Sequence, residues 1–307
     1  MTPADIRRLL MLATLWGGSF LFIRIAVPVL GPIVTVETRV VLAGLTLLAY
    51  ARLTGAPLEL RSYAVPYLVL GALKSAIPFL LISTAELRLT ASMAAILNAT
   101  SPLFGAIFAA IWLRDPLTVR KIIGILIAIV GVGVLVGWSP IALTRGVWLS
   151  IGASLIAAMF YGLAGVYTKS KLKGAPPLGM AVGSQLGAGL LLAGVVPFAP
   201  IHAMPTPIVI ACMLALALLA TSVAYVLYFR LIVDVGPTKA LTVTFLTPMF
   251  GVVWARLFLH EPLSAGKLAA CTIILLGTGF VTGIMPEFPR RPRSKTETAD
   301  VLEGDQA

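Results

Sequence analysis

The stretch NATSPLFG at residues 98–105, with Asp115-Pro116-Leu117 after it, decides the fold because the chain contains it twice. The second copy reads TFLTPMFG at residues 244–251 and is followed by Glu261-Pro262-Leu263. Three pairs of residues are each separated by 146 positions: Pro102 and Pro248, Gly105 and Gly251, Pro116 and Pro262. A constant separation over such a span indicates two copies of one unit.

The composition places this unit in a membrane. Of the 307 residues, 59% are hydrophobic and 11% are charged, whereas about 25% are charged in a typical soluble domain. The mean hydropathy is +1.01, and several apolar runs approach the ~20 residues that cross about 30 Å of hydrocarbon. We therefore expect an all-α integral membrane protein. Cys212 and Cys271 both lie in apolar runs, so we expect no disulfide and no metal or cofactor site.

Ten apolar spans are expected, five in each copy of the unit. They cover residues 9–29, 33–51, 64–84, 91–113, 119–136, 147–168, 178–198, 207–229, 238–259 and 268–285. Accordingly, the first repeat is expected at residues 1–140 and the second at residues 141–285. The polar residues 286–307 are expected to form a disordered cytoplasmic tail.

The positively charged residues predict the orientation, because cytoplasmic loops carry an excess of Lys and Arg. With the N-terminus inside, sixteen of them lie on the cytoplasmic side: Arg7, Arg8, Arg52, Arg61, Arg114, Arg120, Lys121, Lys169, Lys171, Lys173, Arg230, Lys239, Arg290, Arg291, Arg293 and Lys295. Four lie outside: Arg88, Arg145, Arg256 and Lys267. Both termini are therefore expected in the cytoplasm, and the net charge of +11 is a topology signal rather than a sign of nucleic-acid binding.

An odd number of spans in each copy means that the second copy enters the membrane from the opposite side. The two repeats are then inverted, which is the architecture by which many secondary transporters build a central site and alternate its access. Trp16-Gly17 and Tyr161-Gly162 are further counterparts in the two halves.

Several motifs resemble the EamA family of the drug/metabolite transporter superfamily. The second half contributes YVLYFR at residues 225–230, TPMFG at residues 247–251 and Glu261-Pro262-Leu263, and the first half contributes WGGSF at residues 16–20 with its own proline motifs. The resemblance covers nearly the whole chain and implies ten helices and export of amino acids, other metabolites or drugs across the bacterial inner membrane. Within that family the chain is similar to YddG-type amino-acid exporters.

Prolines inside three spans mark the expected pathway. Pro78, Pro102 and Pro248 each free the carbonyl four residues earlier, and the residues at those positions are polar: Lys74, Asn98 and Thr244. Freed carbonyls beside polar groups are tolerated where they face protein or a water-filled cavity. We expect these spans to line a pathway; the alternative is that each kink serves packing alone.

Lys74 is the most informative single residue, because a lysine near mid-span costs about 2.5–3.5 kcal/mol on insertion scales. It is expected to meet a substrate carboxylate; the alternative is that it snorkels to the membrane interface or pairs with a structural group. Arg39 and its counterpart Gln185 face either the cavity or another helix. Arg24, Glu37 and Arg39 lie nearer the outer end, where we expect a salt bridge of Glu37 to Arg24 or a contact with a lipid headgroup to satisfy their charges. The aromatic residues Trp16, Tyr161 and Tyr225 are expected to wall the cavity.

The expected function is export of small, zwitterionic metabolites, amino acids first, by alternating access. The expected partners are such a substrate and the lipid bilayer, and nothing in the sequence requires an oligomer. Carboxylates are scarce in the spans, which favours facilitated efflux or exchange over a proton-driven pump, with Glu37 and Glu86 as the available acids. The alternatives are efflux of lipophilic drugs and, from another class, a passive channel or a structural membrane subunit. No enzyme motif is present.

Overall fold

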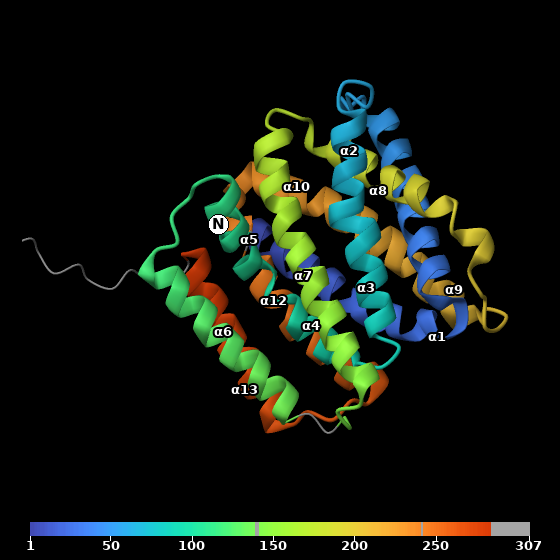
Figure 1. Cartoon of the computed structure of the whole chain (residues 1–307). Helices are drawn as coiled ribbons and strands as arrows, with labels where there is room; N and C mark the ends of the chain where they lie inside the picture. Colours follow the sequence, from blue (N-terminus) through green and yellow to red (C-terminus); the bar gives the residue numbers. More distant parts are fainter. Residues whose placement is uncertain (139–140, 241, 284–307) are drawn as a thin grey trace, which may run out of the picture.

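The computed structural model describes residues 1–138, 141–240 and 242–283, and every regular element in these ranges is a helix (Figure 1). In chain order the elements are α1 (Pro3–Thr54), α2 (Ala64–Gly71), η1 (Ala72–Ala76), α3 (Ile77–Ala85), α4 (Ala91–Asn98), α5 (Ser101–Trp112), α6 (Val119–Gly137), α7 (Arg145–Lys171), α8 (Pro177–Ala193), η2 (Val196–Phe198), α9 (Pro207–Leu214), η3 (Ala215–Val223), α10 (Ala224–Val235), α11 (Pro237–Ala240), α12 (Val243–Leu259) and α13 (Ala265–Thr282). The tail expected at residues 286–307 lies outside the described residues.

Local chemistry explains where many helices begin. A Thr or Ser side chain accepts a backbone N–H at the start of five of them and so satisfies a donor that has no partner within the helix. These residues are Thr2 before α1, Thr90 before α4, Thr118 before α6, Thr144 before α7 and Ser264 before α13.

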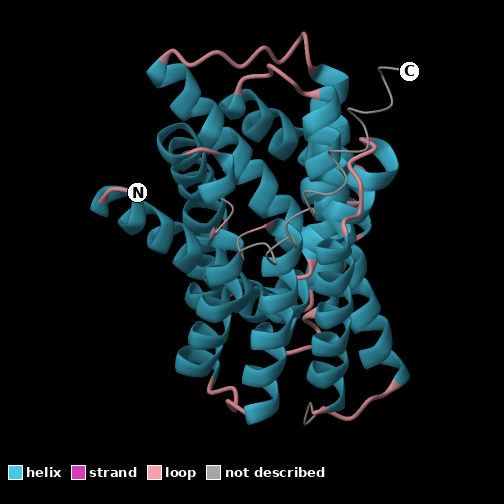
Figure 2. Cartoon of the chain, turned by 90° about the vertical axis from the view of Figure 1, so that its left-hand side faces the viewer, coloured by secondary structure: helices cyan, strands magenta, loops and turns pink. Residues whose placement is uncertain are grey.

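Most helices have the length and apolarity of membrane spans. Within the described residues, seven helical stretches meet both criteria: α1, α2–α3, α4–α5, α6, α7, α9–α10 and α13. The helices α8 and α12 are apolar but shorter, with 17 residues each. Figure 2 shows most helices running between two ends of the molecule at which the loops gather. The fold is thus that of an all-α membrane protein with several apolar helices.

The first helix bends at Gly31. A straight helix of its 52 residues would be about 78 Å long, more than twice the hydrocarbon thickness. Gly31 has φ 73° and ψ 161° and lies between Pro28 and Pro32, so the helical hydrogen-bond pattern is interrupted there. The backbone therefore changes direction, and the two legs of α1 correspond to the first two expected spans.

Two helices contain short π-helical segments at equivalent places. The segment η1 covers Ala72–Ala76 and leads into Pro78, while η3 covers Ala215–Val223. Adding 146 to the numbers of η1 gives residues 218–222, which lie inside η3. Such segments insert an extra residue per turn and often occur at functional sites. In this chain they present Ser75 and Thr221.

Helices of the two halves cross at two glycines. A Cβ atom added to Gly17 of α1 would lie 2.7 Å from Cβ of Phe250 and 2.8 Å from the backbone nitrogen of Gly251. One added to Gly162 of α7 would lie 2.8 Å from the carbonyl carbon of Phe104 and also too close to Gly105. Phe104-Gly105 and Phe250-Gly251 belong to the duplicated motif, so the same crossing is made twice.

The last helices of the two halves pack against each other. The helices α6 and α13 lie side by side at one edge of the molecule (Figure 1). A Cβ atom at Gly124 would lie 2.6 Å from the carbonyl oxygen of Gly277. Small residues let helix backbones approach closely in a membrane, where van der Waals packing drives association.

Candidate functional site

Arg39 is a buried cation at the centre of the second leg of α1. Only 6% of its surface is exposed, and its Nε atom donates a hydrogen bond of 3.0 Å to the hydroxyl of Thr221 on η3. Its guanidinium carbon lies 3.7 Å from the ring centroid of Phe79 on α3. A hydrogen bond and a ring face offset part of the cost of removing this charge from water.

Gln185 on α8 makes the corresponding contacts in the other half. It is fully buried, and its amide nitrogen donates to the hydroxyl of Ser75 at 3.0 Å and to the hydroxyl of Tyr225 at 3.4 Å. Its amide oxygen has no hydrogen-bond partner among the described residues. A buried acceptor left in this way is ready to bind a donor.

The two arrangements are related by the duplication. A shift of 146 positions converts Arg39 into Gln185, Ser75 into Thr221 and Phe79 into Tyr225. In each half, therefore, a polar side chain of the second span bonds a hydroxyl from the π-helical segment of the other half, and contacts an aromatic residue of its own half. The halves differ in chemistry, since one contributes a guanidinium and the other a neutral amide.

Lys74 lies on η1 with its ammonium nitrogen 4.5 Å from the ring centroid of Tyr225. Among the described residues no carboxylate forms an ion pair with it. Its counterpart in the second half is Ala220, so this cation is present on one side only. A cation held by a ring face alone remains able to bind an anion.

Aromatic side chains extend from this cluster. Tyr225 stacks on Phe229 at 5.9 Å, Phe229 contacts Tyr228 at 6.0 Å, and Tyr228 contacts Trp16 at 5.3 Å between ring centroids. Tyr161 of α7 lies 6.5 Å from Phe79. The structure thus brings together the expected residues Arg39, Lys74, Tyr161, Gln185 and Tyr225, with Trp16 at the far end of the aromatic row.

Asn98 and Thr244 belong to other elements. Asn98 is the last residue of α4, and its side-chain oxygen is buried without a hydrogen-bond partner among the described residues. Thr244 is half-buried in the first turn of α12. The two helices meet where a Cβ atom at Gly251 would lie 2.7 Å from Cβ of Ala95, one turn before Asn98.

The three prolines occupy different settings. Pro102 lies in the first turn of α5, just after the interruption at residues 99–100 that separates α5 from α4. Pro78 lies in the first turn of α3, directly after η1. Pro248 lies inside α12, and helical dihedral angles continue through it.

The expected salt bridge between Arg24 and Glu37 does not form. Arg24 instead donates a hydrogen bond to the main-chain carbonyl oxygen of Glu86, and one carboxylate oxygen of Glu37 has no hydrogen-bond partner among the described residues. The first leg of α1 therefore directs Arg24 toward the end of α3 and away from the second leg.

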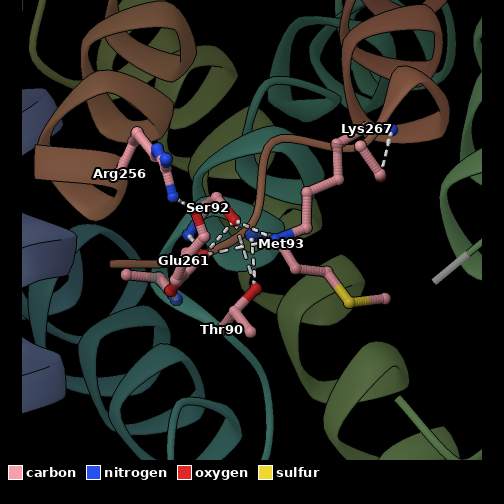
Figure 3. Close-up of polar contacts among 8 residues, drawn as sticks. Thr90, Ser92, Met93, Arg256, Glu261 and Lys267 are labelled. Atoms are coloured by element: carbon pink, nitrogen blue, oxygen red, sulfur yellow. Dashed lines mark hydrogen bonds and ion pairs between the residues drawn. The ribbon is translucent and has the colours of Figure 1, made fainter. Parts of the chain in front are cut away.

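A second polar cluster lies at the end of the bundle that carries the α3–α4 and α12–α13 connections (Figure 3). Glu261 accepts hydrogen bonds from the backbone nitrogens of Ala91 at 2.8 Å and Ser92 at 3.4 Å. It also accepts one from the hydroxyl of Ser92. The ammonium of Lys267 lies 3.4 Å from the same carboxylate and 3.0 Å from that hydroxyl.

An open hollow of about 350 Å³ lies at the opposite end and is lined by Arg8, Phe229, Arg230, Val233 and Asp234. It shares Phe229 with the aromatic row, so the row leads from this surface toward Lys74. No group of His, Cys, Asp or Glu residues in the described part of the chain has the arrangement of a metal site.

Sequence reasoning did not identify three residues of the central cluster: Ser75, Phe79 and Thr221. The duplication could have found them, because Phe79 is the counterpart of Tyr225, and Ser75 and Thr221 are counterparts of each other. The orientation of Ser75 and Thr221 depends on the π-helical segments, and η3 contains no proline that would mark such a segment in the sequence.

The fold defines a helical membrane protein built from two related halves. The chain belongs to the EamA-like transporter family, whose sequence pattern matches residues 8–137 and again residues 148–283. It is therefore a membrane transporter and not an enzyme.

Relatives described as transporters match nearly the whole chain. This chain is 27% identical over 289 residues to "Uncharacterized inner membrane transporter YedA" of Escherichia coli K12, and the match covers 92% of each chain. It is 25% identical over 272 residues to "Uncharacterized transporter YvbV" of Bacillus subtilis, covering 87% of this chain and 88% of that one. A crystal structure of another protein shares the fold with a TM-score of 0.66 at 16% identity, over 92% of this chain and 98% of that chain.

Proposed function

We propose that this transporter exports small zwitterionic metabolites, amino acids first, across the bacterial inner membrane. In this proposal the chain crosses the membrane ten times, as two inverted five-span repeats at residues 1–140 and 141–285. Both termini lie in the cytoplasm, and the two repeats alternate access to a site between them. The resemblance to YddG-type exporters and the distribution of Lys and Arg support this topology.

The observation that carries the proposal is the position of Lys74. Its ammonium rests on the ring of Tyr225, and no described carboxylate pairs with it. A substrate carboxylate at this point would form a charge-assisted hydrogen bond, which is stronger than one between neutral groups. The apolar part of the substrate would then lie against Tyr225, Tyr161 and Phe79.

Buried oxygens supply the other half of the recognition. A zwitterion needs acceptors for its ammonium as well as a cation for its carboxylate. The amide oxygens of Gln185 and Asn98 are buried without partners among the described residues, and Gln185 is joined to Lys74 through Tyr225. In the proposal Gln185 binds the substrate ammonium, Arg39 supports the site through Phe79, and Asn98, Thr244 and Trp16 line the pathway.

Binding of an amino acid and of its amide distinguishes the role of the carboxylate. Thermal unfolding of the purified transporter is measured with leucine, phenylalanine and methionine, and with the same amino acids as C-terminal amides. We expect the acids to raise the melting temperature, because a ligand that binds only the folded state stabilises it. The amides, which lack the carboxylate, should not. In Lys74→Met the acids should lose their effect.

The aromatic row favours a second candidate function, efflux of lipophilic drugs. Trp16, Tyr228, Phe229 and Tyr225 form a continuous row of ring contacts, and aromatic rings suit ligands without a carboxylate. Apolar cations that stabilise wild type and Lys74→Met equally, with no effect of any amino acid, would support this candidate and contradict amino-acid export.

A further inference from the structure

The cluster in Figure 3 joins the two halves of the molecule. Glu261 lies in the α12–α13 connection of the second half, and the helix that it caps, α4, belongs to the first half. Two backbone N–H groups at the start of α4 bond the two carboxylate oxygens, in addition to the cap supplied by Thr90. A carboxylate is favoured at this position because the N-terminus of a helix is its positive end.

The charges of the cluster are almost fully withdrawn from water. The exposed fraction is 10% for the side chain of Glu261 and 4% for that of Lys267. The Ser92 hydroxyl lies between them, donating to Glu261 and accepting from Lys267. A buried pair of this kind is favourable only while every hydrogen bond is made. Separation of α4 from the α12–α13 connection would have to be accompanied by entry of water.

The first half contains an equivalent turn, but the acidic side chain of that turn is exposed. Asp115 and Glu261 are 146 positions apart, as are Lys121 and Lys267. The backbone nitrogens of both acids bond equivalent carbonyl oxygens at 3.2 Å, and the residues before them, Arg114 and His260, both have φ 55°.

The side chains of these equivalent turns differ in exposure. The Asp115 side chain is 48% exposed, against 10% for Glu261, and bonds Lys121 of its own half at 3.2 Å. At one end of the molecule the acidic side chain of the turn is therefore buried and bonded to the other half, and at the other end the equivalent side chain is exposed.

We propose that Glu261, Ser92 and Lys267 form a latch that holds the outer ends of the two halves together, and that it separates once in each transport cycle. This inference rests on the proposed function and its topology. Asp115 and Lys121 are the corresponding residues of the cytoplasmic end, where the latch is open. The structure then represents a state closed to the outside.

The latch can be tested by chemical accessibility, without knowledge of the substrate. In a background with Cys212→Ala and Cys271→Ala, a reporter Asn98→Cys is placed at the end of α4. Right-side-out vesicles are treated with a membrane-impermeant maleimide added outside. We expect Glu261→Gln to raise the labelling rate about tenfold, because a neutral amide accepts weaker hydrogen bonds from α4; tenfold corresponds to ~1.4 kcal/mol. The matched variant Asp115→Asn should not raise the external rate, because Asp115 is not engaged by the other half in the state closed to the outside.

A second variant keeps the test decisive if Glu261→Gln does not fold. Ser92→Ala removes the bridging hydroxyl and its hydrogen bonds with Glu261 and Lys267 but keeps both backbone hydrogen bonds to Glu261. Because the carboxylate stays bonded to α4, we expect a smaller rise in labelling, of about threefold. Unchanged labelling in a folded Glu261→Gln or Ser92→Ala variant would overturn the latch and leave Glu261 as a structural helix cap. Increased labelling in these variants, together with no stabilisation by amino acids of the transporter that retains Asn98, would support the latch while contradicting the proposed substrate.

Discussion

At the scale of single residues, the central cluster combines symmetry of position with asymmetry of charge. Arg39 and Gln185 make equivalent contacts across the two halves, yet only Arg39 is charged, and Lys74 has Ala220 as its counterpart. Both cations therefore come from the first half. A zwitterionic substrate would be oriented by this difference, with its carboxylate toward the first half and its ammonium toward Gln185.

Glu86 provides a residue-scale prediction about pH. It directly follows the span Ala64–Ala85, is 1% exposed, and has no hydrogen-bond partner for its carboxylate among the described residues. Burial raises the pKa of Glu86 well above its usual value of 4.5; Glu261 raises this pKa further, while Arg24 and Arg39 oppose the rise. The folded state therefore binds more protons than the unfolded state between pH 4.5 and the raised pKa.

The sign of the effect on stability follows from linkage. The contribution of Glu86 is fully favourable below pH 4.5 and is lost as pH rises through the raised pKa. We expect Glu86→Gln to melt at a higher temperature than wild type at pH 8, with the difference shrinking toward pH 5. The exposed residue Glu59 supplies the control Glu59→Gln. Parallel melting curves of wild type and Glu86→Gln across this pH range would contradict the prediction.

At the scale of elements, close crossings of helices depend on glycines that can be tested individually. Gly17→Ala would place a Cβ atom 2.7 Å from Cβ of Phe250, and the forced separation of α1 from α12 should cost about 1–3 kcal/mol. Gly133→Ala in α6 meets no atom within 4 Å and should stabilise by ~0.5–1 kcal/mol through helix propensity. Melting temperatures in detergent check both; equal stability of the two variants would contradict the packing described for Gly17.

The elements of the fold differ in how well the sequence predicts them. The duplication, the apolar helices and the equivalence of Gly17 with Gly162 are visible in the sequence, because repeated spacing and long apolar runs are local signals. The π-helical segments are not, since the register of η3 depends on contacts such as the Arg39–Thr221 hydrogen bond between distant residues. The hydrogen bond of Arg24 to the carbonyl oxygen of Glu86 is likewise a contact between distant residues, whereas Phe79 is accessible from the sequence as the counterpart of Tyr225.

At the scale of the whole molecule, the two ends of the bundle differ. Glu261 is engaged by α4 at one end, while the equivalent Asp115 is half-exposed at the other. In the proposed latch mechanism, alternating access exchanges these two arrangements, so that the engaged end separates while the exposed end becomes engaged.

Counterflow in proteoliposomes tests this account most directly. Vesicles containing the transporter are loaded with unlabelled leucine, phenylalanine or methionine and diluted into a trace of the same labelled amino acid. We predict transient accumulation of label above equilibrium in wild-type vesicles, because an alternating carrier exchanges substrate across the membrane, and loss of this accumulation in Lys74→Met. Label that only equilibrates, at a rate independent of the internal amino acid and of Lys74, would contradict both the alternating-access mechanism and the proposed substrate.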